Sequence, residues 1–234
     1  DLRQDERKGV QQIIRSYDRF QQKKREQKEK FDQMLEFDNR FRQEEDDLIA
    51  GIDEAGRGPL AGPVVSAAVI LPLHFTCYGL TDSKQLSEKE RNMYYEKIIE
   101  EAIDYSIAVV SNDEIDQLNI LEATKKSMQD AMIALDPKPT LTLVDAVDLS
   151  FPPYQTKSII KGDAKSISIA AASILAKVYR DRLMNELDQK YPAYGFKNNK
   201  GYGSKDHLNA LQQFGPTPAH RLSFSPVQNA LKNN

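Results

Sequence analysis

The segment LIAGIDEAGRGPLAGPVVSAAVIL, residues 48–71, decides the fold of this chain. Residues 48–55 have the composition of a buried strand that carries Asp53 and Glu54 near its end. A cluster of Gly and Pro then turns the chain, and residues 63–71 have the composition of a second strand. Because only a tight connection separates the two strands, we expect an antiparallel hairpin.

Outward from this hairpin, further segments alternate between strand and helix patterns. Strands are predicted at residues 105–111, 140–146 and 154–160, and helices at residues 87–102, at residues 119–135 and from Ile167 to beyond Leu187. Ser87 and Glu90 have the spacing of a capping box, which marks a helix start. The order predicts an α/β fold with a mixed five-stranded sheet flanked by helices.

Residues 1–47 differ from the rest and are predicted to form a charged helical extension, with the main domain spanning residues 48–234. The extension has 12 basic and 13 acidic residues, no Pro and a single Gly, Gly9. Apolar residues recur at helical spacing in two groups, near Val10 to Phe20 and near Phe31 to Phe41. We expect two short amphipathic helices joined by a charged stretch. An exposed helix without a specific role stays an open alternative.

Composition and charge exclude several classes of protein. The chain has 234 residues, of which 40% are hydrophobic and 29% charged, and no apolar run reaches the roughly 20 residues of a membrane span. The start of the chain shows no signal-peptide core, and Cys77 is the single cysteine, which points to the cytoplasm. The net charge is −3, yet residues 157–205 contain ten basic and four acidic residues. This segment fits either a polyanion partner or a solvated helix face.

Four acidic residues stand at strand ends or at a helix start. Asp53 and Glu54 close the first strand, Asp145 closes the fourth, and Asp163 follows the fifth. If the first and fourth strands are parallel neighbours, their carboxylates meet at one edge of the sheet, and such crowding favours a divalent cation. With no cysteine or histidine suitably placed, the oxygen ligands select Mg²⁺ or Mn²⁺. Each acid could instead be a turn or cap residue, as Asp163 could be for its helix.

Several segments closely resemble the bacterial ribonuclease HII family, the type 2 ribonucleases H. They are GIDEAGRGPLAGPVVSAAVI (51–70), DSKQLSEKER (82–91), NILEATKKSM (119–128), VDA (144–146), KGDAKSISIAAASILAKVYRD (161–181) and YGFKNNKGYGSKDH (194–207). The resemblance implies an RNase H-like fold and endonucleolytic cleavage of RNA paired with DNA. It also implies nicking 5′ of single ribonucleotides in duplex DNA, as ribonucleotide excision repair requires. The type 3 relatives end the acidic quartet with Glu, so Asp163 favours type 2.

The same resemblance assigns roles to individual residues. It makes Asp53, Glu54, Asp145 and Asp163 the catalytic, metal-binding acids. The loop Gly56, Arg57 and Gly58 would sense the ribose 2′-OH through main-chain groups, which suits readout that does not depend on base sequence. Lys84 would contact a phosphate, and Tyr202 would stack on the sugar after the junction.

The mechanism we expect is two-metal hydrolysis that leaves a 3′-OH and a 5′-phosphate. One ion would lie between Asp53, Asp145 and the scissile phosphate, and the second near Glu54 and Asp163. A non-catalytic hybrid-binding protein and a resolvase-like nuclease of the same superfold are the alternatives. We expect a monomer without a membrane segment or a strong sliding-clamp motif.

Other residues are weaker candidates. His207, placed on a helix surface, and His220, placed in a loop, are more often structural than functional. Arg221 could contact phosphate or pin the C-terminal segment. Further duplex contacts are expected from four lysines, namely Lys161, Lys165, Lys177 and Lys200.

Overall fold

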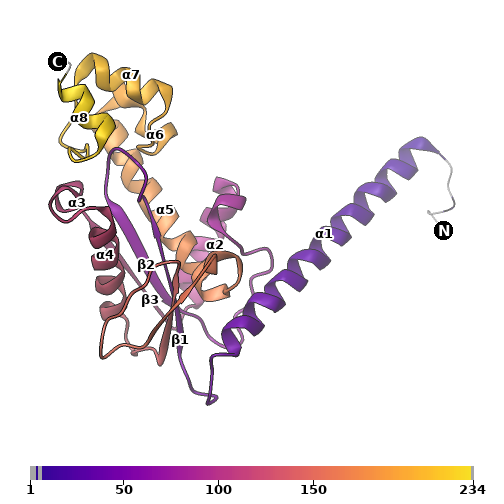
Figure 1. Cartoon of the computed structure of the whole chain (residues 1–234). Helices are drawn as coiled ribbons and strands as arrows, with labels where there is room; N and C mark the ends of the chain where they lie inside the picture. Colours follow the sequence, from indigo (N-terminus) through magenta and orange to yellow (C-terminus); the bar gives the residue numbers. More distant parts are fainter. Residues whose placement is uncertain (1–3, 5–6, 233–234) are drawn as a thin grey trace.

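A computed structural model of the chain describes residue 4 and residues 7–232 and contains a five-stranded mixed sheet in the order β3-β2-β1-β4-β5 (Figure 1). This confirms the predicted fold class. The strands are β1 (Ile49–Ala55), β2 (Val64–Ile70), β3 (Asp104–Val110), β4 (Leu141–Asp145) and β5 (Thr156–Ile159). The larger helices are α1 (Lys8–Asn39), α2 (Glu88–Glu101), α4 (Ile120–Ala134) and α5 (Ile167–Lys190). Shorter ones are α3 (Asn112–Leu118), α6 (Phe196–Asn199), α7 (Lys205–Phe214) and α8 (Ser225–Lys232).

The strand register confirms the expected hairpin and the expected central pairing. Strand β1 runs antiparallel to β2, with Asp53 opposite Ala67. On its other side β1 runs parallel to β4, with Ile52 opposite Val144. The residues that follow this last pair, Asp53 and Asp145, therefore emerge side by side at the same edge of the sheet.

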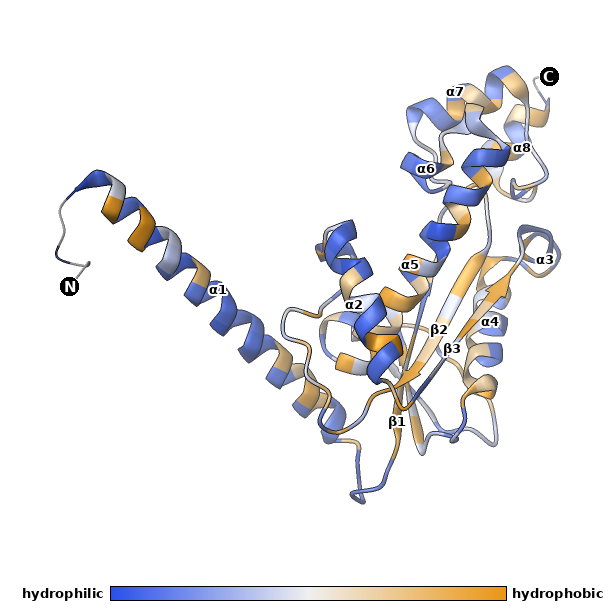
Figure 2. Cartoon of the chain, turned by 180° about the vertical axis from the view of Figure 1, so that it is seen from behind, coloured by the Kyte–Doolittle hydropathy of each residue, from blue (hydrophilic) through white to orange (hydrophobic). Residues whose placement is uncertain are grey.

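Helices cover both faces of the sheet and bury all of β2 and the first five residues of β1. One face packs against α5 and α2 through residues such as Val65 and Val69, and the other packs against α4 through Met128 and Met132. Figure 2 shows the strands as largely hydrophobic, as burial on both faces requires. At Gly51, a Cβ would overlap the backbone of Ser168, so α5 lies directly on β1 because this position has no side chain.

The extension forms one continuous helix, α1, over Lys8–Asn39, so the expectation of two short helices is wrong. The stretch expected to separate them consists of Gln, Lys, Arg and Glu, which are all good helix formers. The Gln22 side chain donates a hydrogen bond to Glu26 at 2.8 Å, a contact that stabilises helix at this spacing. Because this stretch contains neither Gly nor Pro, the helix continues through it.

The first half of α1 projects from the body, whereas its second half packs against it (Figure 1). Phe31 and Met34 are buried in the main core, and the Phe31 ring meets Tyr78 edge-on with centroids 5.4 Å apart. At the other end of the molecule, α6, α7 and α8 gather around the end of α5. Within the described part of the chain, no helix is long and apolar enough to cross a membrane.

Candidate active site

The carboxylates of Asp53, Asp145 and Asp163 converge at the edge where β1 and β4 end. One oxygen from each lies within 4.8 Å of the other two, although the residues are far apart in sequence. Strand register places Asp53 beside Asp145, and the short turn η3 (Gly162–Ala164) brings in Asp163. The Gly162 N–H donates to Asp145 Oδ1 at 2.6 Å, which ties this turn to the strand.

Asp163 does not cap α5, because Ser166 does so by accepting a hydrogen bond from the Ile169 N–H. The turn that carries Asp163 precedes the helix instead of opening it. The turn is entered through Lys161 at φ +55°, and Ala146, directly after Asp145, has φ +49°. Left-handed backbone at non-glycine residues is costly and often marks functional sites.

Glu54 lies beside this cluster and contributes a second kind of carboxylate. Its Oε1 is 3.5 Å from Arg57, while its buried Oε2 has no hydrogen-bond partner among the described residues. A buried carboxylate oxygen without a donor is unfavourable unless a cation or a ligand satisfies it. Glu54 is therefore placed to complete the acidic site from the side of the glycine loop.

Crowding and burial oppose ionisation at this edge. Burial raises the pKa of Asp53 well above its ordinary value, and the charges of Glu54 and Asp145 raise it further. Burial also raises the pKa of Glu54 and of Asp163, and Asp145 adds to both. Carboxylate oxygens this close together are unfavourable when ionised without a counter-charge. They therefore fit a hard divalent cation such as Mg²⁺ or Mn²⁺.

A cavity of about 410 Å³ adjoins the acids and is lined by the predicted glycine loop. Gly56 has φ +97°, and a Cβ there would overlap the Arg180 side chain, so the loop requires glycine at this position. A Cβ on Gly58 would lie 3.4 Å from the Tyr202 ring, which is half exposed. The loop and the tyrosine thus form neighbouring walls of one cavity with Asp53 and Glu54.

Two fully buried arginines support the loop, and one of them went unpredicted. Arg180, on α5, donates to the carbonyls of Pro63, Lys200 and Ala61 at 2.9–3.1 Å. The signal was present in the sequence, because Arg180 follows Ser173 and Ser166 at seven-residue spacing on one face of the helix. Burial lowers the pKa of Arg180 to about 10.

Arg221 is the second buried arginine, and its environment excludes direct contact with a phosphate. Its guanidinium donates to the carbonyls of Gly62, Arg57 and Gly56 at 2.5–2.9 Å, and it is 0% exposed. Of the two roles that the sequence left open, it therefore takes the structural one: it pins the C-terminal segment to the glycine loop. Burial lowers the pKa of Arg221 to about 9.

His207 and His220 form a buried pair, so the expected placement of His207 on a helix surface is wrong. Their Nε2 atoms are 3.0 Å apart, His220 Nδ1 accepts from the Thr217 N–H, and His207 Nδ1 lies 2.9 Å from the Tyr202 carbonyl. A carbonyl only accepts, so His207 donates to Tyr202 and His220 donates to His207. Burial lowers both pKa values, to about 4 for His220. The neutral pair fixes the backbone of Tyr202.

Lys84 lines the same cavity as Asp53, Glu54 and the glycine loop. Ser83 contacts Ser173 of α5 at 2.8 Å between hydroxyl oxygens, which holds the turn η2 (Ser83–Gln85) against the site. Burial alone would lower the pKa of Lys84, but the surrounding carboxylates, Asp82 and Asp163 foremost, raise it. An exposed ammonium beside the acids is suited to an anionic substrate.

The four lysines proposed as duplex contacts divide into two groups. Lys161 and Lys165 are exposed and flank the turn that carries Asp163. Lys177 lines the 410 Å³ cavity but pairs with Asp181 at 2.6 Å, and Lys200 donates to Asn185 Oδ1 at 2.7 Å. The first pair is therefore the more available for a polyanion.

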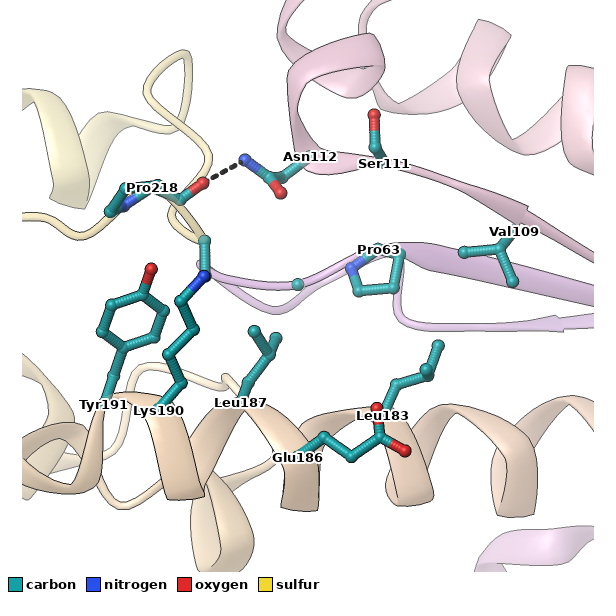
Figure 3. A pocket seen from close by; sticks show the side chains of 12 residues that line it. Pro63, Val109, Ser111, Asn112, Leu183, Glu186, Leu187, Lys190, Tyr191 and Pro218 are labelled. Carbon is teal, nitrogen blue, oxygen red and sulfur yellow. Dashed lines mark hydrogen bonds between the residues drawn. The ribbon is translucent and has the colours of Figure 1, made fainter.

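A second cavity, of about 470 Å³, lies between α5 and the ends of β2 and β3 (Figure 3). Leu183, Leu187 and Val109 make its walls largely apolar, and Asn112 crosses it by donating to the Pro218 carbonyl at 2.9 Å. Glu186 is its single acidic lining residue, so this cavity does not offer the carboxylate cluster found at the sheet edge.

Sheet order, flanking helices and the carboxylate edge together define a ribonuclease H-like protein. The family described as ribonuclease HII matches residues 50–227, and a family described as the ribonuclease HII N-terminal domain matches residues 1–42. A ribonuclease HII from Bacillus cytotoxicus is 50% identical over 232 residues, which cover 99% of this chain and 89% of the relative.

Two solved structures extend the comparison. Ribonuclease H2 from Pyrococcus horikoshii has a TM-score of 0.68 at 30% identity and covers 79% of this chain and 97% of its own. The ribonuclease HII of Archaeoglobus fulgidus, solved in complex with PCNA, has a TM-score of 0.64 at 27% identity and covers 78% and 96%. This chain belongs to the ribonuclease HII family and is a ribonuclease H enzyme.

Proposed function

We propose that this chain cleaves the RNA strand of RNA/DNA hybrids and nicks duplex DNA on the 5′ side of a single embedded ribonucleotide. The products would be a 3′-OH and a 5′-phosphate. The proposal rests on one observation: a set of convergent carboxylates lies next to a glycine loop that exposes main-chain groups. The first fits hydrolysis of a phosphodiester, and the second fits recognition of a sugar.

The acids have distinct places in this mechanism. Asp53 and Asp145 would share one divalent ion, and Glu54 and Asp163 would hold a second, with Mg²⁺ or Mn²⁺ as the candidates. When bound, the ions supply an activated water and stabilise charge on the leaving 3′ oxygen. The unpartnered Oε2 of Glu54 and the raised pKa of Asp53 support a role that needs positive charge nearby.

Substrate recognition would fall to the neighbouring residues. Main-chain groups of Gly56, Arg57 and Gly58 would contact the ribose 2′-OH, since that hydroxyl distinguishes a ribonucleotide from its deoxy counterpart. Tyr202, which is half exposed against Gly58, would stack on the following sugar. Lys84, which lines the same cavity, would contact a phosphate.

A single assay tests the proposal. The chain is incubated with Mg²⁺ or Mn²⁺ and a DNA duplex that contains one ribonucleotide, and the product ends are mapped. We expect one nick 5′ of the ribonucleotide and none in the all-DNA duplex. Binding without any nick would favour a non-catalytic hybrid-binding protein, and cleavage of both duplexes would favour a resolvase-like nuclease.

The variant Asp145→Asn provides the control for this assay. It keeps an oxygen that accepts the Gly162 N–H but removes a charge from the cluster. We expect cleavage to fall by several orders of magnitude while duplex binding changes little. Loss of stability with cleavage retained would assign Asp145 a structural role instead. A cytoplasmic monomer without a clamp-binding motif remains our prediction for the protein's context.

A further inference from the structure

Tyr202 lies on a stretch of chain that its own side chain does little to hold in place. The ring is 50% exposed, and glycines stand on both sides of the residue, at positions 201 and 203. Gly201 has φ +86°, a conformation that few other residue types adopt. Because the neighbours are flexible and the ring is half exposed, the position of Tyr202 depends on hydrogen bonds to its main chain.

Three hydrogen bonds hold the main chain of Tyr202. Its N–H donates to the Asn199 carbonyl at 2.9 Å, and its carbonyl accepts from the Ser204 N–H at 2.8 Å. The same carbonyl also accepts from His207 Nδ1 at 2.9 Å. Of these three partners, only His207 acts through its side chain, so a substitution can remove this contact while the main-chain contacts remain.

Packing holds the imidazole of His207 in place. His207 and His220 are 0% and 1% exposed, and the rings of Tyr194 and Phe196 flank both imidazoles with centroid distances of 5.0–6.2 Å. His207 lies in the first turn of α7, and its N–H donates to the side chain of the cap residue Ser204 at 3.3 Å. The donor therefore has a fixed base and closely packed surroundings.

One arrangement of protons satisfies the contacts of the histidine pair. The Thr217 N–H donates to His220 Nδ1 at 2.9 Å, so the proton of His220 is on Nε2. The Tyr202 carbonyl only accepts, so the proton of His207 is on Nδ1. The two Nε2 atoms are 3.0 Å apart, and His220 donates to His207 between them. The donor that reaches Tyr202 thus belongs to a chain of hydrogen bonds that begins at Thr217.

The loop that carries His220 also holds the opposite wall of the 410 Å³ cavity. Arg221, the next residue, donates to the Gly56 carbonyl of the glycine loop at 2.5 Å. Because adjacent residues act on the two walls, this loop determines the position of Tyr202 relative to the glycine loop.

We propose that the His207–His220 pair positions Tyr202 for stacking on the sugar and thereby sets the affinity for the substrate. The inference rests on the proposed function, because it requires Tyr202 to stack on the substrate. A gap of about 0.5–1 Å already forfeits a quarter to a half of the attraction between two surfaces, so a small shift of the Tyr202 main chain should weaken binding. The acids lie on β1, β4 and η3, so the chemical step should change little.

Two variants of His207 separate its two side-chain hydrogen bonds. The amide nitrogen of Asn stands as many bonds from Cα as imidazole Nδ1 does, and the amide of Gln stands as many bonds away as Nε2. His207→Asn therefore keeps a donor for the Tyr202 carbonyl, whereas His207→Gln keeps a polar partner for His220 and loses that donor. Both variants lose the ring that packs on Tyr194 and Phe196, so each controls for the structural cost of the other.

Each variant is made in the wild type and in Tyr202→Ala. Nicking of a duplex with one ribonucleotide in Mg²⁺ gives kcat and KM, and binding in a chelator gives Kd. Thermal unfolding sets an assay temperature at which every variant is folded. Tyr202→Ala should raise Kd roughly tenfold, a loss typical of a stacking ring.

We expect His207→Gln to raise Kd and KM roughly fivefold while kcat stays within about twofold. His207→Asn should restore most of the affinity. In Tyr202→Ala the two His207 variants should bind equally, because no ring remains to be positioned.

Equal affinities of the Asn and Gln variants in the wild type would overturn the inference. So would a loss in His207→Gln that persists without the Tyr202 ring, or a fall in kcat with KM unchanged. In each case nicking by the wild type would still support the proposed function. Absence of any nick by the wild type would instead count against the proposed function itself.

Discussion

At the scale of single residues, the ionised form of Asp53 is electrostatically unfavourable in the folded protein. The side chain is 5% exposed, and burial raises its pKa well above the ordinary 3.8, with Glu54 and Asp145 adding to the effect. Between the ordinary and the raised pKa, the folded chain holds more protons than the unfolded chain, so stability falls as pH rises through that window. A divalent cation would remove the penalty.

Asp53→Asn should therefore stabilise the metal-free protein at neutral pH while abolishing cleavage. The amide keeps the oxygen that accepts the Glu54 N–H at 2.7 Å. Thermal unfolding in a chelator measures the gain, at about 2–4 °C per kcal/mol for a chain of this size. The gain should vanish as pH falls below 3.8, where wild-type Asp53 becomes neutral in both states. A variant that is less stable than the wild type at neutral pH would contradict this account.

The histidine pair has the opposite pH dependence. Burial lowers the pKa of His220 from 6.5 to about 4, so the unfolded chain takes up a proton before the folded chain does. The stability that the neutral His220 provides is complete above pH 6.5 and is lost as pH falls toward 4.

His220→Phe tests this dependence because a ring still packs on Tyr194, whose centroid is 5.0 Å from that of His220. The Thr217 N–H loses its acceptor, so the variant should be about 1–3 kcal/mol less stable at pH 7. Thermal unfolding should show the difference shrinking between pH 6.5 and 4. His74→Phe, on an exposed loop, should not reproduce the effect, and a pH-independent difference would refute the neutral pair.

How far the sequence predicted the site depends on the kind of residue. The convergence of Asp53, Asp145 and Asp163 was predictable because each stands at or just after the end of a strand, and strand order then determines where those ends meet. Arg180 donates a hydrogen bond to the carbonyl of the distant Pro63, and the histidine pair joins α7 to a loop beyond its end. Those contacts form only when the chain folds, so no local sequence pattern predicted them. The one exception is Arg180, whose seven-residue spacing from Ser173 places it on the same face of α5.

At the scale of elements, local rules predicted the strands and α5 well and failed where two patterns competed. Helix α3 was missed although Ser111 and Glu114 form a capping box like that of Ser87. Its seven residues are too few to show helical periodicity. In α1, two separate groups of apolar residues with a charged stretch between them suggested two helices, yet that stretch has high helix propensity and the helix continues through it.

Asp38 links two of these elements and should contribute to the stability of both. It lies on α1, is 2% exposed, and its Oδ2 accepts from the Ser168 N–H in the first turn of α5 at 2.9 Å. Asp38→Ala should cost about 1–2 kcal/mol in unfolding free energy, since it leaves the buried Ser168 N–H without its acceptor. Asp38→Asn, which keeps an acceptor oxygen, should cost less.

Urea unfolding measures the Asp38 effect, and Asp32→Ala supplies the control because Asp32 is exposed on the same helix. The control should change stability by no more than about 0.5 kcal/mol. Equal losses in the two alanine variants would show that α1 does not support α5 through this hydrogen bond.

At the scale of the whole molecule, the fold assembles one chemical site from three separated acids and a glycine loop, with Tyr202 arriving from the C-terminal part of the chain. The extension is less separate than its composition suggested, because Phe31 and Met34 belong to the main core. The boundary at residue 47 between the extension and the main domain therefore stays a prediction, and residues on both of its sides pack in the same core.

The most direct measurement is the anomalous scattering of a crystal of this protein soaked in Mn²⁺. The account predicts a strong peak bound by Asp53, Asp145 and Asp163, and its loss from a crystal of Asp145→Asn. Carboxylates found apart from one another, or manganese bound elsewhere while these three side chains stay empty, would contradict the claim that this edge of the sheet is the metal-dependent centre.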